Sequence, residues 1–302
     1  MAAITRTPMT RRDRSNLRKG LLFISPWMIG FLVFVLYPLV YSCVMSFTRY
    51  SGFLAPVWLG TANYIRLFTD PLVWQSIYNT AFYLLWAIPV GLVVALLLAL
   101  AMSRAVREVS AYRTALYLPS LVPIFAMSFI FIVLVNPQYG IVNRAFGLFG
   151  VPNIDYLGDP TSAKLVIVVL AQLGAGNIAL IFLAGLNSIP RTLYEVAQID
   201  GANRLTCFLH ITLPLLSPVI LFNLITGISA GLQVFAPAYI MTNGGPDNGT
   251  LFYMYYMYKN AFSYAQLGYA CALSVVLFIF GLILAVIVYR LSQRFVNYEL
   301  VS

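Results

Sequence analysis

The side chains best suited to binding a polar solute are amides that lie inside long apolar segments. At 100° per residue, four residues of one segment fall within an arc of about 120°, and two residues of another segment share a face. Amides beside small residues can line a path and hydrogen-bond the hydroxyl groups of a neutral sugar. They can equally bond neighbouring membrane helices, so both interpretations stay open. The two sets are Asn223, Gly227, Ala230 and Gln233, and Gly174 with Asn177.

A hydrolase motif occurs in the same segment. Gly227-Ile228-Ser229-Ala230-Gly231 matches G-x-S-x-G, which needs a strand-to-helix turn and a histidine base. The motif lies in the middle of an apolar run, and His210, the single histidine, lies in a polar stretch. The same residues match G-x-x-x-G, a close-packing surface of membrane helices. We therefore expect no catalytic residue and no enzyme activity.

Nucleotide and metal sites are not expected in this chain. A phosphate-binding loop needs Gly-Lys-Ser/Thr, and none of the three lysines, at 19, 164 and 259, follows a glycine. The three cysteines, at 43, 207 and 271, have no metal-ligand spacing. We expect no metal and no bound cofactor, so that any ATP, with its Mg²⁺, must be used by another chain.

Composition indicates an integral membrane protein. Of 302 residues, 61% are hydrophobic and only 9% are charged, against about 25% charged in soluble domains. Residues 1–20 form a polar tail, and residues 21–302 form one domain with six runs of spanning length. None of the runs contains Asp, Glu, Lys or Arg, and prolines inside them predict kinks. The runs are Leu21–Phe47, Tyr78–Met102, Thr114–Val135, Leu165–Leu186, Leu215–Met241 and Leu267–Tyr289.

The distribution of basic residues predicts the orientation. With the N-terminus inside, the inner segments hold 13 Lys and Arg and the outer loops hold 5, Lys164 among them. This asymmetry predicts that both termini are cytoplasmic, and it accounts for the net charge of +9 without nucleic acid as a partner. The first run is too long for a signal-peptide core, so we expect a retained span.

The inner stretch 188–214 has the pattern of two helices joined by a corner. Leu193, Val196 and Ala197 form one apolar stripe after the helix-start signal of Pro190. Gly201 then allows a left-handed cap, and a second stripe follows, made of Leu205, Phe208, Leu209 and Thr212. Such a surface fits a cleft of another protein, or it lies on lipid as an interfacial helix.

Ten residues of this stretch resemble the EAA loop of ABC-transporter permeases. The family pattern is Glu-Ala-Ala, a glycine four residues later and Ile-x-Leu-Pro ten residues after that, and Val196 here replaces the first alanine. The resemblance implies a cytoplasmic coupling loop for an ATPase subunit. The matching residues are Glu195, Val196, Ala197, Asp200, Gly201, Ala202, Phe208, Ile211, Leu213 and Pro214.

An outer segment carries a second resemblance. It is similar to the stretch after the fifth span of sugar-type permeases, through Phe235, Tyr239, residues 242–246, Thr250, Tyr258 and Ala261-Phe262. The resemblance implies a bacterial or archaeal cytoplasmic (inner) membrane. It also implies three kinds of partner: a second homologous permease subunit, two copies of an ABC ATPase and an extracytoplasmic solute-binding protein.

The sequence therefore predicts an all-α integral membrane protein with six transmembrane helices. We expect it to be the permease subunit of an ATP-driven ABC importer for a sugar or related polyol, working by alternating access. The alternative is a self-contained secondary transporter of a small polar solute. That class predicts ion-site carboxylates or broken half-helices at the midplane, and the spans contain no carboxylate. The sequence does not name the solute.

Overall fold

The computed structural model describes residues 11–104 and 109–292, and helices dominate it. Its elements are α1 (Arg11–Phe31), the π-helix η1 (Leu32–Leu36), α2 (Tyr37–Met45), β1 (Thr48–Arg49), β2 (Val57–Trp58), α3 (Ala62–Thr69), α4 (Pro71–Met102), α5 (Val109–Tyr117), the 3₁₀-helix η2 (Leu118–Leu121), α6 (Ile124–Leu134), α7 (Ile141–Gly147), α8 (Pro160–Gln172), α9 (Ala175–Ser188), α10 (Arg191–Ile199), α11 (Arg204–Cys207), the π-helix η3 (Phe208–Thr212), α12 (Leu213–Leu215), α13 (Ser217–Gly231), the π-helix η4 (Ala238–Thr242), α14 (Tyr253–Tyr258), the π-helix η5 (Lys259–Ser263) and α15 (Leu267–Ser292). Residues 1–10, half of the predicted polar tail, lie outside the described part.

Three helices are long and apolar enough to cross a membrane. They are Arg14–Met45, which joins α1, η1 and α2, then α4 and α15. Three further pairs pass the same test together but are bent, α5–η2 against α6 by 88°, α8 against α9 by 45°, and Arg204–Leu215 against α13 by 61°. Within residues 11–104 and 109–292, the number of spans therefore lies between three and six.

The bends occur where proline or a tightened turn interrupts the helix. Pro119 and Pro123 flank the 88° bend. Proline lacks the N–H that a continuing helix needs, so the helix is interrupted here. Between α8 and α9 the N–H groups of Leu173 and Gly174 bond carbonyls only three residues back, at 3.2 and 3.1 Å, which tightens the chain at that point. The third and fourth predicted runs are thus broken helices.

The fifth predicted run also differs from the structure. The run was expected to continue to Met241, but α13 ends at Gly231 and the chain turns before η4. Pro237 lies between the two, where it interrupts helical hydrogen bonding. The continuous helix of this run therefore has 15 residues, and its outer part is irregular.

Lys164 does not lie in an outer loop as the sequence predicted. Helix α8 begins at Pro160, with Asp159 as its N-cap, so Lys164 falls within the helix and is only 6% exposed. Its Nζ lies 3.4 Å from Asn79 Oδ1 and 5.0 Å from the ring centre of Tyr78. The ammonium is thus surrounded by an amide oxygen and aromatic faces. The predicted fourth run began at Leu165, one residue after Lys164, so the lysine was counted with the outer loop.

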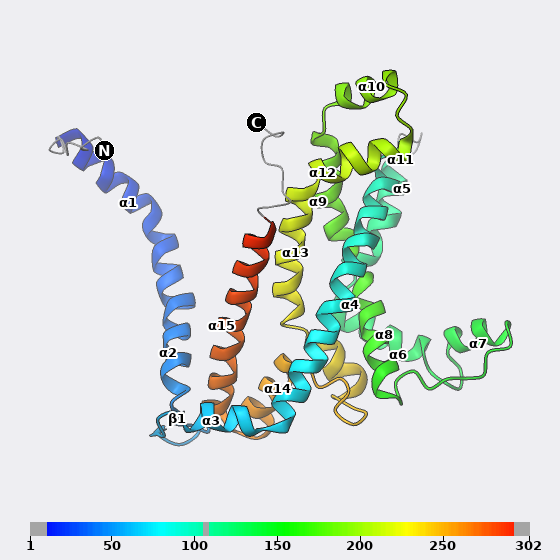
Figure 1. The fold of residues 1–302 in the computed structure, drawn as a ribbon. Coiled ribbons are helices and arrows are strands. Elements are labelled where there is room, and N and C mark those ends of the chain that lie inside the picture. Colours follow the sequence, from blue (N-terminus) through cyan, green and yellow to red (C-terminus); the bar gives the residue numbers. More distant parts are fainter. Residues whose placement is uncertain (1–10, 105–108, 293–302) are drawn as a thin grey trace.

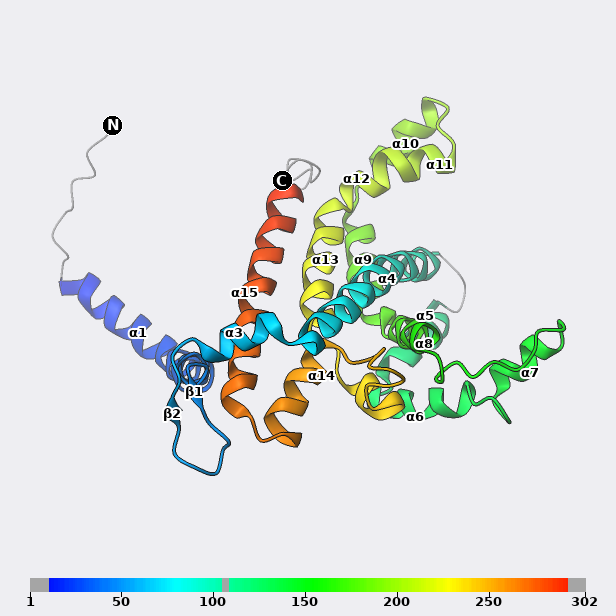
Figure 2. The same ribbon diagram turned by 60° about the horizontal axis from the view of Figure 1, so that its bottom comes forward.

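The helices form a bundle with two different ends (Figure 1). Helices α10 and α11 project from one end, where α1 begins and α15 finishes. The β1–β2 hairpin and α3 lie at the other end, and Figure 2 shows α7 on an arm to the side. Helix α4 packs against α8, α9 and α13, and α15 packs against α2 and α13. The helix Arg14–Met45 leans away, and its most apolar stretch is unburied.

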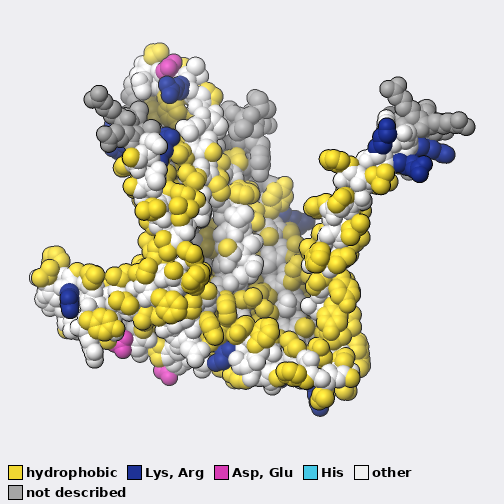
Figure 3. Space-filling view, turned by 180° about the vertical axis from the view of Figure 1, so that it is seen from behind, with side chains coloured by type: hydrophobic (Ala, Val, Ile, Leu, Met, Phe, Trp, Pro, Cys, Tyr) yellow, Lys and Arg dark blue, Asp and Glu magenta, His cyan; other side chains and the backbone are white. Residues whose placement is uncertain are grey.

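Small residues allow α4 and α9 to approach closely. Ala95 and Ala99 of α4 and Ala175 and Ala179 of α9 are buried in one cluster with Phe182, as is usual for membrane helix pairs. Figure 3 shows apolar side chains over the sides of the bundle and charged side chains toward its ends. This is the surface of an integral membrane protein.

Gly268 should be intolerant of substitution because α15 starts directly against the hairpin. A Cβ there would collide with the carbonyl oxygen of Thr48, which is backbone and cannot give way. We expect Gly268→Ala to lower the stability of the purified protein by about 1–3 kcal/mol, measured as the thermal unfolding midpoint in detergent. Gly30→Ala is the control, because nothing lies within 4 Å of its Cβ position. Equal midpoints for the two variants would contradict this packing.

Candidate functional site

Helix α10 is followed by a corner and then by α11, η3 and the start of α12, which we call the second arm. Together these elements form a projecting loop, residues 190–214, which we call the loop arm. Pro190 is the N-cap of α10, and Gly201 has a φ of +79°, which favours glycine. The Gly201 N–H donates to Gln198 O at 3.1 Å, and the Ala202 N–H donates to Ala197 O at 2.8 Å. These bonds satisfy the last carbonyls of α10 and fix the turn.

The outer face of the loop arm is apolar and exposed. Val196 is 57% exposed, Ile199 85% and Leu205 65%, and α10 has no buried residue. Glu195 and Asp200 are exposed beside them, while Ala197 and Ala202 are half-buried. A contiguous exposed apolar surface with a polar rim is typical of a protein or membrane contact site.

The second arm does not form the single exposed stripe that the spacing predicted. Leu205 and Leu209 are exposed, but Phe208 is half-buried and Thr212 is 5% exposed. The hydroxyl groups of Tyr194 and Thr212 lie 2.9 Å apart, so the two arms are joined across their inner sides. Ile211, Leu213 and Pro214 are half-buried where the arm returns to the bundle.

A cavity of about 820 Å³ lies between the loop arm and the ends of α4 and α9. Leu100 and Ser103 line it from α4, and Leu186 lines it from α9. Arg191 and Arg204 line it from the loop arm. The loop arm is therefore attached to the bundle at its two ends, and the cavity separates its middle from α4 and α9.

Four of the six predicted path residues surround one cavity of about 200 Å³. Gly174, Asn223, Gly227 and Ala230 line it, between α4, the α8–α9 break and α13. Asn223 is only 2% exposed, and its Nδ2 donates to Val219 O at 2.9 Å. The two predicted sets, which are about 50 residues apart in the sequence, thus meet at one place.

Helix α4 and Gln172 contribute to the same cavity and were missed from the sequence. Tyr83 and Gly91 line it from α4. The Oε1 of Gln172 is buried without a hydrogen-bond partner, whereas its Nε2 donates to Val168 O at 2.7 Å. An unpaired buried acceptor is costly unless a water or hydroxyl donor reaches it. An amide inside an apolar run, two residues before Gly174, was a usable signal.

The other two predicted path residues lie elsewhere. Gln233 follows the end of α13 and lines a separate cavity of about 470 Å³ with Ser229 and Met257, because the helix stops before the predicted arc is complete. The Oδ1 of Asn177 accepts a hydrogen bond of 3.0 Å from the Tyr117 hydroxyl. Asn177 is exposed and not part of the 200 Å³ cavity.

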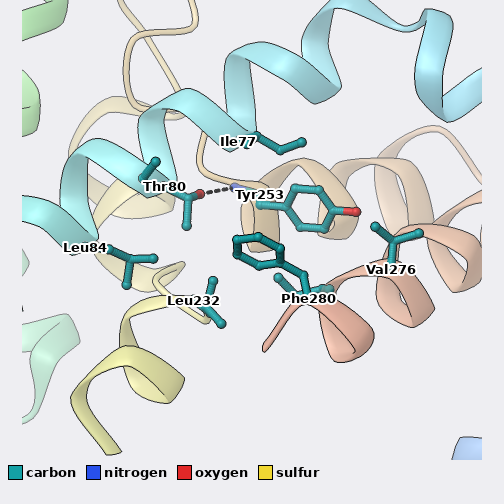
Figure 4. A pocket seen from close by; sticks show the side chains of 9 residues that line it. Ile77, Thr80, Leu84, Leu232, Tyr253, Val276 and Phe280 are labelled. Carbon is teal, nitrogen blue, oxygen red and sulfur yellow. Dashed lines mark hydrogen bonds between the residues drawn. The ribbon is translucent and has the colours of Figure 1, made fainter. Parts of the chain in front are cut away.

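An apolar cavity of about 130 Å³ lies nearby, between α4, α14, α15 and the end of α13 (Figure 4). Leu84, Leu232 and Phe280 face it. Thr80 accepts a 2.9 Å bond from the Tyr253 N–H, and the Tyr253 hydroxyl donates to Leu273 O at 2.9 Å. With its polar groups paired, this cavity offers no site for a hydroxylated solute.

The segment between η4 and α14 lies at the end of the bundle opposite the loop arm. Asn79 Nδ2 donates to the carbonyl oxygens of Asn248 and Leu251 at 2.8 and 3.1 Å, so α4 holds this segment directly. Four rings of the segment that resembles sugar-type permeases form one cluster, with centres 4.8 to 5.8 Å apart along its contacts. They belong to Phe235, Tyr239, Tyr258 and Phe262.

Comparison with known proteins identifies this arrangement. The chain is 38% identical to the probable ABC transporter permease protein YesP of Bacillus subtilis, over 96% of this chain and 95% of that protein. It is 33% identical to the arabinooligosaccharides transport system permease protein AraP of the same organism, over 91% and 88%.

A solved structure has the same fold. It is a chain of a bacterial alginate ABC transporter in complex with an alginate pentasaccharide-bound periplasmic protein, with a TM-score of 0.82 and 24% identity, and it matches over 94% of this chain and 98% of that one. A family model matches residues 87–297, which include the loop arm and the α9 and α13 walls of the 200 Å³ cavity. The chain belongs to the family of binding-protein-dependent transport system inner membrane components.

Proposed function

We propose that this chain is the permease subunit of an ATP-driven importer for a sugar or related polyol. The observation that carries the proposal is the loop arm, whose exposed apolar face stands clear of the bundle (Figures 1 and 2). An ATPase that binds this face would supply the energy. Relatives named for oligosaccharide transport support a sugar as the solute.

The loop arm is connected directly to both sides of the 200 Å³ cavity. Helix α9 leads into α10, and α11 to α12 lead into α13, while residues of α9 and α13 line that cavity. A rigid displacement of the loop arm by a partner therefore moves two cavity walls together. This linkage supports alternating access, in which closure of the ATPases opens the path to one side at a time.

The complete transporter would contain further chains. A second related permease would complete the path, two ATPase copies would bind the loop arms, and an extracytoplasmic solute-binding protein would deliver the sugar. The alginate transporter with its periplasmic protein supports the last partner. ATP and Mg²⁺ would bind only to the ATPases.

Two features of the structure bear on the alternative of an ion-coupled secondary transporter: broken helices occur among the described residues, and Lys164 places a charge within a helix of a predicted span. Its described neighbours are the Asn79 amide, the Tyr78 and Phe82 rings, and the carboxylate of Asp159, the exposed N-cap of α8. An ion pathway would need carboxylates deeper in the span or a water-filled cavity. The comparisons favour the ABC class.

The proposal is tested by reconstituting the purified permeases with their ATPase and solute-binding protein in proteoliposomes. We expect uptake of the bound sugar only when ATP is present on the side of the membrane where the ATPase is bound. Uptake by the permease alone along an ion gradient would support the secondary transporter.

A topology of six spans with both termini cytoplasmic predicts that the loop arm and the outer segment (residues 235–262) lie on opposite sides of the membrane. Cysteines placed at Ser188 and Asp247, in a background where the native Cys43, Cys207 and Cys271 are serine, should label from opposite sides. A membrane-impermeant thiol reagent added to intact cells should label only position 247. Labelling of both positions from outside would exclude this topology.

A further inference from the structure

A polar pocket of about 460 Å³ lies at the end of the molecule opposite the loop arm. It is bounded by the β1–β2 hairpin, α3 and the residues where α15 begins. Figure 2 shows the hairpin at the edge of the bundle, and α3 leading from it past the start of α15 to α4. Its lining includes Arg49, Tyr50, Asn63, Arg66, Gln266 and Tyr269.

Two arginines give this pocket a positive charge that its own lining does not neutralise. None of the described residues lining it is Asp or Glu. Arg66 lies 4.1 Å from the Tyr269 ring centre, and its Nη1 donates to Gln266 Oε1 at 2.7 Å. Asp70 is close and keeps its negative charge, with its Oδ2 accepting hydrogen bonds from the hydroxyls of Tyr256 and Tyr269, but one carboxylate does not balance two guanidinium groups. A guanidinium keeps further donors for a carboxylate after one neutral hydrogen bond.

The pocket is built rigidly. Asn63 Nδ2 donates to the carbonyl oxygens of Ser46 and Thr48 at 2.8 and 2.9 Å, and Asn63 is 7% exposed. The Gly268 N–H donates to Tyr50 O at 3.0 Å. The hairpin, α3 and the start of α15 are thus fixed to one another, and a preformed site loses little entropy when it binds a partner.

We propose that this pocket receives a carboxylate side chain of the solute-binding protein. The proposal rests on the proposed function, which brings that protein to this end of the molecule. Charge complementarity favours an acidic group, and a volume of about 460 Å³ lined by both Arg49 and Arg66 is large enough for a carboxylate side chain. Gln266 immediately precedes α15. A carboxylate that replaced Gln266 as the hydrogen-bond acceptor of Arg66 would therefore change a contact at the outer end of the sixth predicted span.

The experiment measures binding of the solute-binding protein to the complete transporter in nanodiscs, at several salt concentrations. Arg49→Gln and Arg66→Gln should each weaken binding about tenfold at low salt, with a smaller difference at high salt. Arg144→Gln is the matched control, because Arg144 is an exposed arginine of α7 outside the pocket, and it should bind like wild type. Uptake should also be unchanged for Arg144→Gln.

A cycle of double mutants then identifies the partner group. An Asp→Asn or Glu→Gln variant of the solute-binding protein that weakens wild-type binding should have no further effect on Arg49→Gln. Unchanged affinity of both arginine variants would overturn the proposal. A difference that disappears in nanodiscs without anionic lipid would also overturn it, because the anion would then be a lipid phosphate. Failure of wild-type uptake is a separate result and contradicts the proposed function.

Discussion

Replacing Gly201 by valine is expected to abolish solute uptake while the protein remains in the membrane. Gly201 has a φ of +79°, and a branched residue held there is strained by about 1–3 kcal/mol. Nothing lies within 4 Å of its Cβ position, so the effect comes from the backbone conformation and not from a clash. The corner would relax, and α10 would no longer lie at a fixed angle to the second arm.

Reconstitution with the ATPase measures the result as uptake and as solute-stimulated ATP hydrolysis, both of which should be lost. Gly201→Asn is the control, since asparagine tolerates a positive φ, and it should retain most of the activity. Glu195→Lys tests the same surface by charge, because Glu195 is exposed on α10. Losing a desolvated charge partner costs about 2–5 kcal/mol. Wild-type uptake and hydrolysis in Gly201→Val and Glu195→Lys would mean that the loop arm rests on lipid.

The second large effect is expected from Asn223→Leu. This change keeps the size of a buried side chain that lines the 200 Å³ cavity but removes its hydrogen-bonding groups. If solute hydroxyls bind there, we expect uptake to fall at least about tenfold, because an unpaired polar group costs about 1–3 kcal/mol. Binding of the ATPase should be unchanged.

Thr226→Val is the matched control on α13, because Thr226 bonds carbonyls of its own helix and does not line the cavity. Asn177→Leu, at the other amide that the sequence placed on the path, separates two explanations. Asn177 bonds Tyr117 outside the cavity, so its effect should be smaller than that of Asn223→Leu. Normal transport kinetics in both asparagine variants would assign these amides to helix packing.

Features that depend on one residue type were predictable from the sequence. The helix corner at Gly201 follows from glycine between two apolar stripes, and α15 follows the predicted sixth run within three residues at its end. The cavity residues of α13 were found because amides and glycines recur at helical spacing. Local sequence is sufficient where a pattern has one structural solution.

The breaks in the helices were not predictable in the same way. Apolar composition is the same on both sides of Leu173 and Gly174, so the run read as one span although the backbone bends there by 45°. Lys164 was assigned to a loop because a lysine usually marks the end of a span. Its partners Asn79 and Tyr78 are some 85 residues away, and only the packing of α8 on α4 brings them together.

The contact between α2 and α15 joins the first long helix of the chain to its last. Ribosomes add about 5–20 residues per second, and about 220 residues separate Met45 from Leu267. The first helix therefore waits for some 10–45 seconds of synthesis before its own partner leaves the ribosome. During that time the first helix is surrounded by lipid and by the parts of the chain already synthesised, without α15. We therefore expect chains that stop before Leu267 to be degraded by membrane proteases.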